Sequence, residues 1–220
     1  MTFALNRGVS FCRVDNRFVV LDLVGDRYFC LEGAAEDAFR RLTDGTSAPP
    51  GSRADGERLV ALGIVRHCAE AKSITPCLAP PTAASQVVPL GVRITLGNCI
   101  AASARLVAAK ITLKLFGLDA VIAPLVRIKR RQRRASEARH HLQSIITQFQ
   151  NLDRWVTPLD QCVPRSVAIM RCCLAAHIDA TLVIGVKLRP FAAHCWVQHG
   201  DMLLAEQLDT VRLYTPILVV

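Results

Sequence analysis

The chain has 220 residues, of which 51% are hydrophobic and 20% charged, so it can bury a core and is too apolar to be intrinsically disordered. Its formal net charge is +9, and this excess lies in residues 76–150, which carry eleven basic and two acidic side chains. The N-terminus lacks the pattern of a secretory signal, and no apolar run approaches the roughly 18 residues of a membrane span, so we expect a cytoplasmic protein without a membrane span.

Three short strand-like runs open the chain, and two short helices follow them. Residues that tolerate tight turns, Asp15-Asn16 and Gly25-Asp26, separate the runs. The first predicted helix ends at Gly45, and the second covers Ala54–Leu62. The three predicted strands are Val9–Val14, Phe18–Val24 and Arg27–Leu31. Together these elements predict a compact N-terminal module over residues 1–68.

The next stretches differ from this module in composition. Residues 69–90 hold four prolines and are predicted to be a linker. Residues 98–150 are rich in Ala, Leu, Lys and Arg, which predicts helix with an interruption at Pro124. The densest charge of the chain is the basic run 127–134, for which a solvated helix face is the commonest explanation. Nucleic acid is not an expected partner, because no aromatic residues are interleaved with the charges and no binding motif is present.

A helix followed by three strands is predicted for the last third of the chain. The helix runs from Val163 to about His177, and Ala180–Leu188 has the composition of a buried strand. After Pro190, a second strand is predicted over His194–Gln198. A turn at His199-Gly200-Asp201 then returns the chain antiparallel over Met202–Glu206. Residues 91–220 are therefore expected to form an α+β domain.

Cys162 lies at the predicted start of this helix, with Pro164 in the first turn, where a missing N–H has no cost. The positive end of the helix dipole favours a thiolate at this place. The unpaired N–H groups of the first turn are also suited to hold an oxyanion. The position of Cys162 thus predicts a nucleophile with donors for the charge that its attack develops.

A thiolate nucleophile needs a base, and the base needs an orienting partner. With Gly200 at the centre of the hairpin, His194 and Glu206 are predicted to be directly opposed across the two strands, with about 5 Å between their Cβ atoms. A carboxylate there would hold the tautomer of the imidazole. A register slip of one residue would turn one of the two side chains away.

Structural roles are the alternative for each of these residues. The chain has nine cysteines at irregular spacing without a CxxC pair, which argues against a disulfide framework and indicates a reducing compartment. Cys172, Cys173 and Cys195 are assigned to the core. A zinc site built from Cys162, His177, His194 and His199 is disfavoured, because these residues lack the paired ligand spacing of structural zinc. No metal and no cofactor are expected.

The motifs of the C-terminal domain resemble those of the lasso-peptide leader peptidases, or B proteins, of the transglutaminase-like cysteine protease superfamily. The resemblance covers about residues 90–220 and rests on CVPRS from Cys162, LVIGV from Leu182, PF from Pro190 and AHCWV from Ala193. It implies a papain- or transglutaminase-like helix-plus-antiparallel-sheet fold, with Cys162 as nucleophile and His194 as base. The third residue of that family is typically an Asp, whose position falls on Glu206 here, so Asp209 and Asp201 remain weaker candidates for the orienting acid.

The N-terminal module resembles the leader-recognition element of ribosomal peptide pathways, a small winged-helix fold. This resemblance rests on the stretch VLDLVGDRYFCLEG and on its place upstream of the peptidase domain. In that family the leader peptide adds a strand to the edge of the third β-strand and packs against the third helix. The corresponding groove residues here are Tyr28, Phe29, Cys30, Leu31, Arg58, Leu59 and Leu62.

The two resemblances together imply a cysteine peptidase that binds and removes the leader of a ribosomally synthesised precursor during lasso-peptide maturation. The implied partners are the precursor leader and a separate, asparagine-synthetase-like, ATP-using cyclase. The basic run 127–134 would then be a docking surface for the cyclase, an acidic leader or an anionic surface. Two other functions stay open: acyl transfer from the same triad to an amine instead of water, and leader binding by a chaperone without catalysis.

Overall fold

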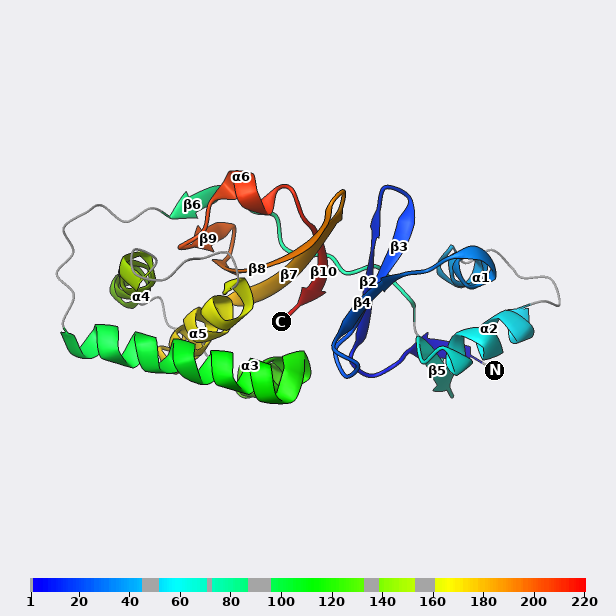
Figure 1. Ribbon diagram of the computed structural model, residues 1–220, viewed down its shortest axis with the longest axis horizontal. Coiled ribbons are helices and arrows are strands. Elements are labelled where there is room, and N and C mark those ends of the chain that lie inside the picture. Colours follow the sequence, from blue (N-terminus) through cyan, green and yellow to red (C-terminus); the bar gives the residue numbers. More distant parts are fainter. Residues whose placement is uncertain (1, 45–51, 71–72, 87–95, 133–138, 153–160) are drawn as a thin grey trace. The chain divides into compact units, whose positions relative to one another are not determined.

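The structure is a computed structural model that describes residues 2–44, 52–70, 73–86, 96–132, 139–152 and 161–220. The chain divides into two compact units, Met1–Leu78 and Ala79–Val220, which are described separately (Figure 1). Both units combine helices with antiparallel strands, which confirms the expected α+β class. None of the helices that the structure describes has both the length and the apolarity to cross a membrane.

A three-stranded antiparallel sheet in the order β2-β3-β4 forms one part of unit 1. The strands are β2 (Val9–Val14), β3 (Arg17–Asp22) and β4 (Arg27–Cys30), close to the predicted runs. Asp15 and Asn16 join β2 to β3 with φ values of 48° and 64°, which is the turn conformation that their side chains tolerate. The turn chemistry predicted from the sequence is thus confirmed at this hairpin.

Two helices and a second strand pair complete the described part of unit 1. The helices are α1 (Gly33–Thr43) and α2 (Ser52–Ala61), while the predicted end of the first helix at Gly45 lies outside the described residues. The pair of β1 (Thr2–Leu5) and β5 (Val65–Cys68) was not predicted. The core is centred on Phe39, whose ring meets Phe11 and Phe18 edge to face at 4.8 and 5.2 Å between centroids.

The segment predicted to be a linker, residues 69–90, contributes to both units. Ile74 is buried in the core of unit 1, and the N–H of Cys77 donates to the carbonyl of Phe11 in β2. Further along, β6 (Ala84–Gln86) belongs to the sheet of unit 2. The boundary between the units, after Leu78, falls inside this segment.

Unit 2 contains a five-stranded sheet in the order β10-β7-β8-β9-β6 (Figure 1). All its pairings are antiparallel except the parallel pair of β6 and β9. β7 occupies an interior position, and its residues Leu182–Val186 are all buried, as expected for a strand covered on both faces. The other strands are β8 (Phe191–His199), β9 (Met202–Leu204) and β10 (Thr215–Val219), and β7 covers Thr181–Leu188.

The helices of unit 2 are α3 (Leu96–Arg131), α4 (Arg139–Leu152), α5 (Cys162–Ala175) and the short α6 (Leu208–Val211). The predicted interruption at Pro124 is wrong, because Pro124 lies within α3. The break falls at Gly117, whose φ of 76° and ψ of −174° lie outside the helical region and are accessible mainly to glycine.

α5 is the central helix of unit 2. It packs against β7 and β8 on one side and against α3 and α4 on the other. Nearly every residue from Pro164 to Leu174 is therefore buried, including Cys172 and Cys173, as predicted. A helix enclosed in this way has little freedom to move, so its first residue is held at a fixed place relative to β8.

The described part of the basic run 127–134 ends at Gln132. Lys129 binds within unit 2, because its Nζ donates to the backbone oxygen of Val220 at 3.2 Å and to the hydroxyl of Thr181 at 3.3 Å. Burial lowers the pKa of Lys129, and nearby Asp179 opposes this effect. Arg127, Arg130 and Arg131 are exposed, so this part of the run is divided between an anchoring lysine and solvated arginines.

Candidate active site

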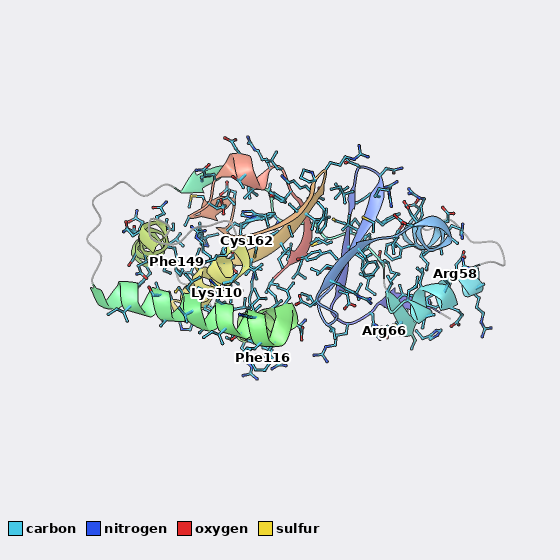
Figure 2. All side chains as sticks on the ribbon, viewed as in Figure 1. Arg58, Arg66, Lys110, Phe116, Phe149 and Cys162 are labelled. Atoms are coloured by element: carbon cyan, nitrogen blue, oxygen red, sulfur yellow. The ribbon has the colours of Figure 1, made fainter. Side chains whose placement is uncertain are left out.

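Cys162 is the first residue of α5, one position before the predicted helix start (Figure 2). Gln161 occupies the N-cap position without a capping bond from its side chain, and its carbonyl accepts the N–H of Arg165 at 2.9 Å. The earlier N–H groups of the first turn have no partner within the helix, which is the usual state of a helix start. The half-buried thiol of Cys162 therefore lies at the positive end of a helix that the rest of unit 2 encloses.

His194 lies on β8, opposite Gly185 of β7. Its imidazole is hydrogen-bonded to the side chain of Cys162. Its Nε2 also lies 3.1 Å from Oε2 of Glu206, and the two side chains are only 16% and 17% exposed. The structure thus brings together the three residues that the sequence predicts as nucleophile, base and orienting acid.

The charges of this group shift the pKa values of His194 and Glu206 in directions that favour an ion pair between them. Burial alone would lower the pKa of His194, but hydrogen bonds and charge from Cys162 and Glu206 outweigh it and raise this pKa to about 9. Burial would likewise raise the pKa of Glu206, but His194, the N–H of Gln207 and the charge of Arg165 together lower it. At neutral pH, His194 is therefore an imidazolium that lies between the sulfur of Cys162 and the carboxylate of Glu206.

The predicted register between His194 and Glu206 is wrong. β8 and β9 pair Gln198 with Leu203 and His199 with Met202, so the hairpin turns on two residues and is not centred on Gly200. β9 also ends at Leu204, before Glu206. Glu206 reaches His194 because Ala205 adopts a φ of 55° and turns the chain out of the strand.

A buried hydrogen bond fixes α5 to the strand of the histidine. The hydroxyl of Ser166 donates to the backbone oxygen of Cys195 at 2.8 Å, and both residues are almost fully buried. Cys195 follows His194 but points into the core, where burial raises the pKa of its thiol strongly. The assignment of Cys195 to the core agrees with this burial, and the Ser166 bond joins the helix that carries Cys162 to the strand that carries His194.

Two aromatic rings, for which the sequence predicted no role, lie beside the imidazole. The ring of Tyr214 lies 5.3 Å from that of His194, and the ring of Trp196 stacks at 6.2 Å. Gly185 leaves room for both, since a Cβ there would come within 2.8 Å of the Trp196 ring and 2.9 Å of the Tyr214 Cβ. The signal for this packing was present in the sequence, because a glycine inside an apolar strand often marks a close approach.

The alternative acids lie outside this group, and so do two of the four disfavoured zinc ligands, His177 and His199. Asp201 is exposed in the turn after β8, and Asp209 is exposed in α6. Nδ1 of His199 lies 2.6 Å from the backbone oxygen of Asp179, and His177 is exposed after α5. Within the described ranges, no group of three or more Cys, His, Asp or Glu side chains is arranged to hold a metal ion.

The residues predicted to bind a leader are divided between the surface and the core of unit 1. Leu31 and Leu59 are 3% and 0% exposed and belong to the core, and Phe29 packs against that core. Leu62 is 47% exposed just after α2. Tyr28 and Cys30 are half-buried on β4, and Arg58 is exposed on α2.

β4 is an outer strand of its sheet. It pairs with β3 on one side, and no strand pairs with its other edge in the part of unit 1 that the structure describes. The N–H of Leu31 donates to the carbonyl of Phe18, so alternation directs the backbone groups of Phe29 toward β3 as well. The backbone groups of Cys30 therefore face the outer edge of β4.

The arrangement of Cys162, His194 and Glu206 suits nucleophilic attack on an acyl group. It places a sulfur at a helix start, an imidazole hydrogen-bonded to that sulfur, and a carboxylate behind the imidazole. The family model described as the transglutaminase-like superfamily matches residues 103–219, which include all three side chains. Neither the curated proteins nor the solved structures gave a match. The match indicates an enzyme of the cysteine protease or acyltransferase type at the level of the superfamily. It covers more than half of the 220 residues, and the chain therefore belongs to the transglutaminase-like superfamily.

Proposed function

We propose that the chain is a cysteine peptidase that removes the leader from a ribosomally made precursor peptide during lasso-peptide maturation. The observation that carries the catalytic part is the hydrogen-bonded series from Cys162 through His194 to Glu206, within the matched superfamily domain. The motifs around these residues, which resemble those of lasso-peptide leader peptidases, support the choice of substrate class. Removal of the leader would free the core peptide for a separate ATP-using cyclase.

In the first half of the reaction, Sγ of Cys162 attacks the carbonyl carbon of the last leader residue. N–H groups at the start of α5 stabilise the oxyanion, which is the usual role of donors at this place. The imidazolium of His194 then gives its proton to the departing amine as the C–N bond breaks, leaving a thioester on Cys162. The pKa of about 9 at His194 supports this step, because the proton is present at neutral pH.

In the second half, neutral His194 takes a proton from water, which attacks the thioester. The S–C bond breaks and the leader leaves as a carboxylic acid, which loses its remaining proton to solvent, while the proton that His194 took returns the Cys162–His194 pair to its starting state. Glu206 keeps Nε2 of the imidazole in place through both halves, at 3.1 Å. Transfer to an amine would follow the same course, with the amine in place of water.

We further propose that unit 1 is a leader-recognition element of the winged-helix type. Its three-stranded sheet is followed along the chain by helices, and β4 is the outer strand of that sheet, and both features support this assignment. A leader that adds a strand there would form hydrogen bonds to the backbone groups of Cys30. The exposed side chains of Arg58 and Leu62 would add contacts from α2 and the residue after it.

Incubation of the full chain with the precursor peptide encoded beside its gene tests the catalytic proposal. Mass spectrometry should show one cut between leader and core, which Cys162→Ala abolishes and Cys68→Ala, at a half-buried cysteine of unit 1, leaves intact. Adding a labelled primary amine separates the alternatives. An amine adduct instead of a free carboxylate would favour acyl transfer, and unchanged precursor that still binds would favour a chaperone.

Fluorescence anisotropy of a labelled leader peptide with the full chain tests the recognition proposal. Cys30→Pro removes an N–H from the unpaired edge without removing a bond to β3, and proline is tolerated on outer strands. We expect Cys30→Pro to weaken binding about tenfold and Cys30→Ala, which keeps the N–H, to bind like the wild type. Equal affinity for both variants would contradict strand addition at β4.

A further inference from the structure

The segment that carries Glu206 has a conformation that its own residues do not favour. After β9 ends at Leu204, Ala205 adopts a φ of 55°, in the left-handed region that alanine rarely occupies. Without this turn the chain would continue in the direction of the strand. The position of Glu206 beside His194 therefore depends on contacts that hold Ala205 in place.

Arg165 makes these contacts. Its guanidinium donates to the backbone oxygen of Ala205 at 2.7 Å and lies 3.9 Å from Oε2 of Glu206. Its side chain is only 12% exposed, so the contact is shielded from water. Further along, the N–H of Leu208 donates to the hydroxyl of Ser85 at 2.8 Å, which anchors the far end of the same segment.

Arg165 lies three residues after Cys162 in the first turn of α5. Positions three apart in a helix lie on the same face, so one helical turn presents both the sulfur and the guanidinium. The helix that supplies the nucleophile thus also contacts the segment that carries the acid.

We propose that Arg165 is a positioning residue, which holds the Ala205–Glu206 segment so that the carboxylate of Glu206 reaches Nε2 of His194. The inference rests on the proposed function, because it concerns the base of that site. Arg165 positions the imidazole through Glu206 and need not touch the substrate.

The pKa of His194 separates this role from a simple effect of charge. A positive guanidinium near the imidazolium repels it, so loss of the charge alone would raise the pKa of His194. Loss of a well-placed Glu206 has the opposite effect, because the carboxylate stabilises the imidazolium. Among the residues that the structure describes, the titratable and charged groups around His194 are Cys162 and Arg165 of α5, Glu206 after β9, Tyr214 before β10 and, beyond the Tyr214 ring, Lys187 of β7.

The experiment is an NMR titration of His194 in the full chain with ¹³C-labelled histidine, assigned by the signal that His194→Ala removes. Arg165→Gln should lower the pKa of His194 from about 9 by roughly half a unit to one unit. Arg165→Lys, which keeps the charge but not the fork of donors, should shift it in the same direction. Arg171→Gln, two turns further along α5, is the matched control and should leave it unchanged.

Glu206→Gln supplies the test of mechanism. If Arg165 acts through Glu206, the downward shift should vanish without the carboxylate, and the pKa of His194 in the double variant Arg165→Gln/Glu206→Gln should be no lower than in Glu206→Gln alone. An upward shift in Arg165→Gln, no shift, or a shift that adds fully to that of Glu206→Gln would each overturn the proposal. Thermal unfolding shows which variants fold, and Arg165→Lys carries the test if Arg165→Gln does not.

A cleavage assay with the precursor peptide distinguishes this inference from the function on which it rests. Cleavage that survives Cys162→Ala would end the proposed function whatever the titration shows. Cleavage that requires Cys162 while Arg165→Gln leaves both cleavage and the pKa of His194 unchanged would end the role of Arg165 alone. The expected result is a loss of cleavage in Arg165→Gln that accompanies the lower pKa.

Discussion

Cys12 of unit 1 and Cys162 of unit 2 carry the same thiol in two different environments. Cys12 is 1% exposed in the three-stranded sheet, where burial, together with nearby Cys77 and Cys30, raises its pKa to about 12. Burial also raises the pKa of Cys77 to about 11. These thiols are protonated at neutral pH and serve as small apolar side chains. Cys162 instead lies half-buried at a helix start, where it is hydrogen-bonded to the imidazole of His194.

This contrast shows that neither sequence neighbourhood nor burial alone makes a cysteine reactive. Cys195 is adjacent to the same histidine in sequence, but the alternation of β8 directs its side chain into the core. Cys173 lies in the same helix as Cys162, and burial raises its pKa to about 12. The distinction comes from the helix start and from contact with His194, which only the folded unit provides.

The largest expected effect is the loss of catalysis at Cys162 or His194. Cys162→Ala removes the nucleophile and His194→Ala removes the proton carrier, so each should lower the rate of precursor cleavage by roughly four or more orders of magnitude. Mass-spectrometric rate measurements check this, with Cys172→Ala, a buried cysteine of the same helix, as the control for packing. Cleavage near the wild-type rate in either active-site variant would remove the contrast between the two kinds of cysteine.

Glu206→Gln should have a smaller effect, because the nucleophile and base remain. We expect a loss of about a hundredfold, which is the cost of misplacing a catalytic group by about 1 Å. The alkaline limit of the rate should also move to lower pH. In the wild type the imidazolium persists up to a pKa of about 9, and without the carboxylate it loses its proton earlier as pH rises. A rate–pH profile that keeps its alkaline limit would show that Glu206 does not support the histidine.

Gly185→Ala tests the packing behind the histidine. The new Cβ would meet the Trp196 ring and the Tyr214 Cβ at less than 3.0 Å, so strand or ring must move. We expect a loss of about 1–3 kcal/mol in the free energy of unfolding, measured by denaturant titration, together with slower cleavage. Wild-type stability and cleavage would show that the rings do not hold the imidazole.

Gly56→Ala is the matched change in unit 1 and should have the smallest effect. The three atoms nearest to its Cβ would be outer atoms of the half-buried Phe3 ring, so movement of this one side chain would relieve the overlap, and alanine favours helix over glycine. We expect a net loss of about 1 kcal/mol or less in the free energy of unfolding and no change in cleavage. A loss of cleavage in this variant would show that the effect of Gly185→Ala is not specific to the site.

Local patterns predicted the elements whose residues are neighbours in sequence. The strands from Val9 to Cys30 follow from alternation and turn residues, and the buried strand β7 follows from its apolar composition. The predicted start of the helix at Val163 is one residue from the observed start at Cys162, because Pro164 marks a first turn. In the site, the same patterns placed the cysteine and the histidine on the correct elements.

The remaining features depend on contacts between residues distant in sequence, or on backbone conformations that the residue type does not predict. β6 is three residues long and acquires its strand form from pairing with β9 far along the chain. The break in α3 lies at Gly117 and not at Pro124, because its backbone leaves the helical region there. The left-handed conformation of Ala205 cannot be predicted from the residue type. The approach of Glu206 to His194 was therefore predicted from a strand register that the structure does not have.

Competitive alkylation of the nine cysteines by iodoacetamide at pH 7, resolved by peptide mass spectrometry, tests the central contrast most directly. Cys162 should react at least about tenfold faster than the similarly half-buried Cys30 and Cys68, and His194→Ala should remove this advantage. If Cys162 reacts no faster than Cys30 and Cys68, or if His194→Ala leaves its rate unchanged, the imidazole does not activate the thiol and the account of the site is wrong.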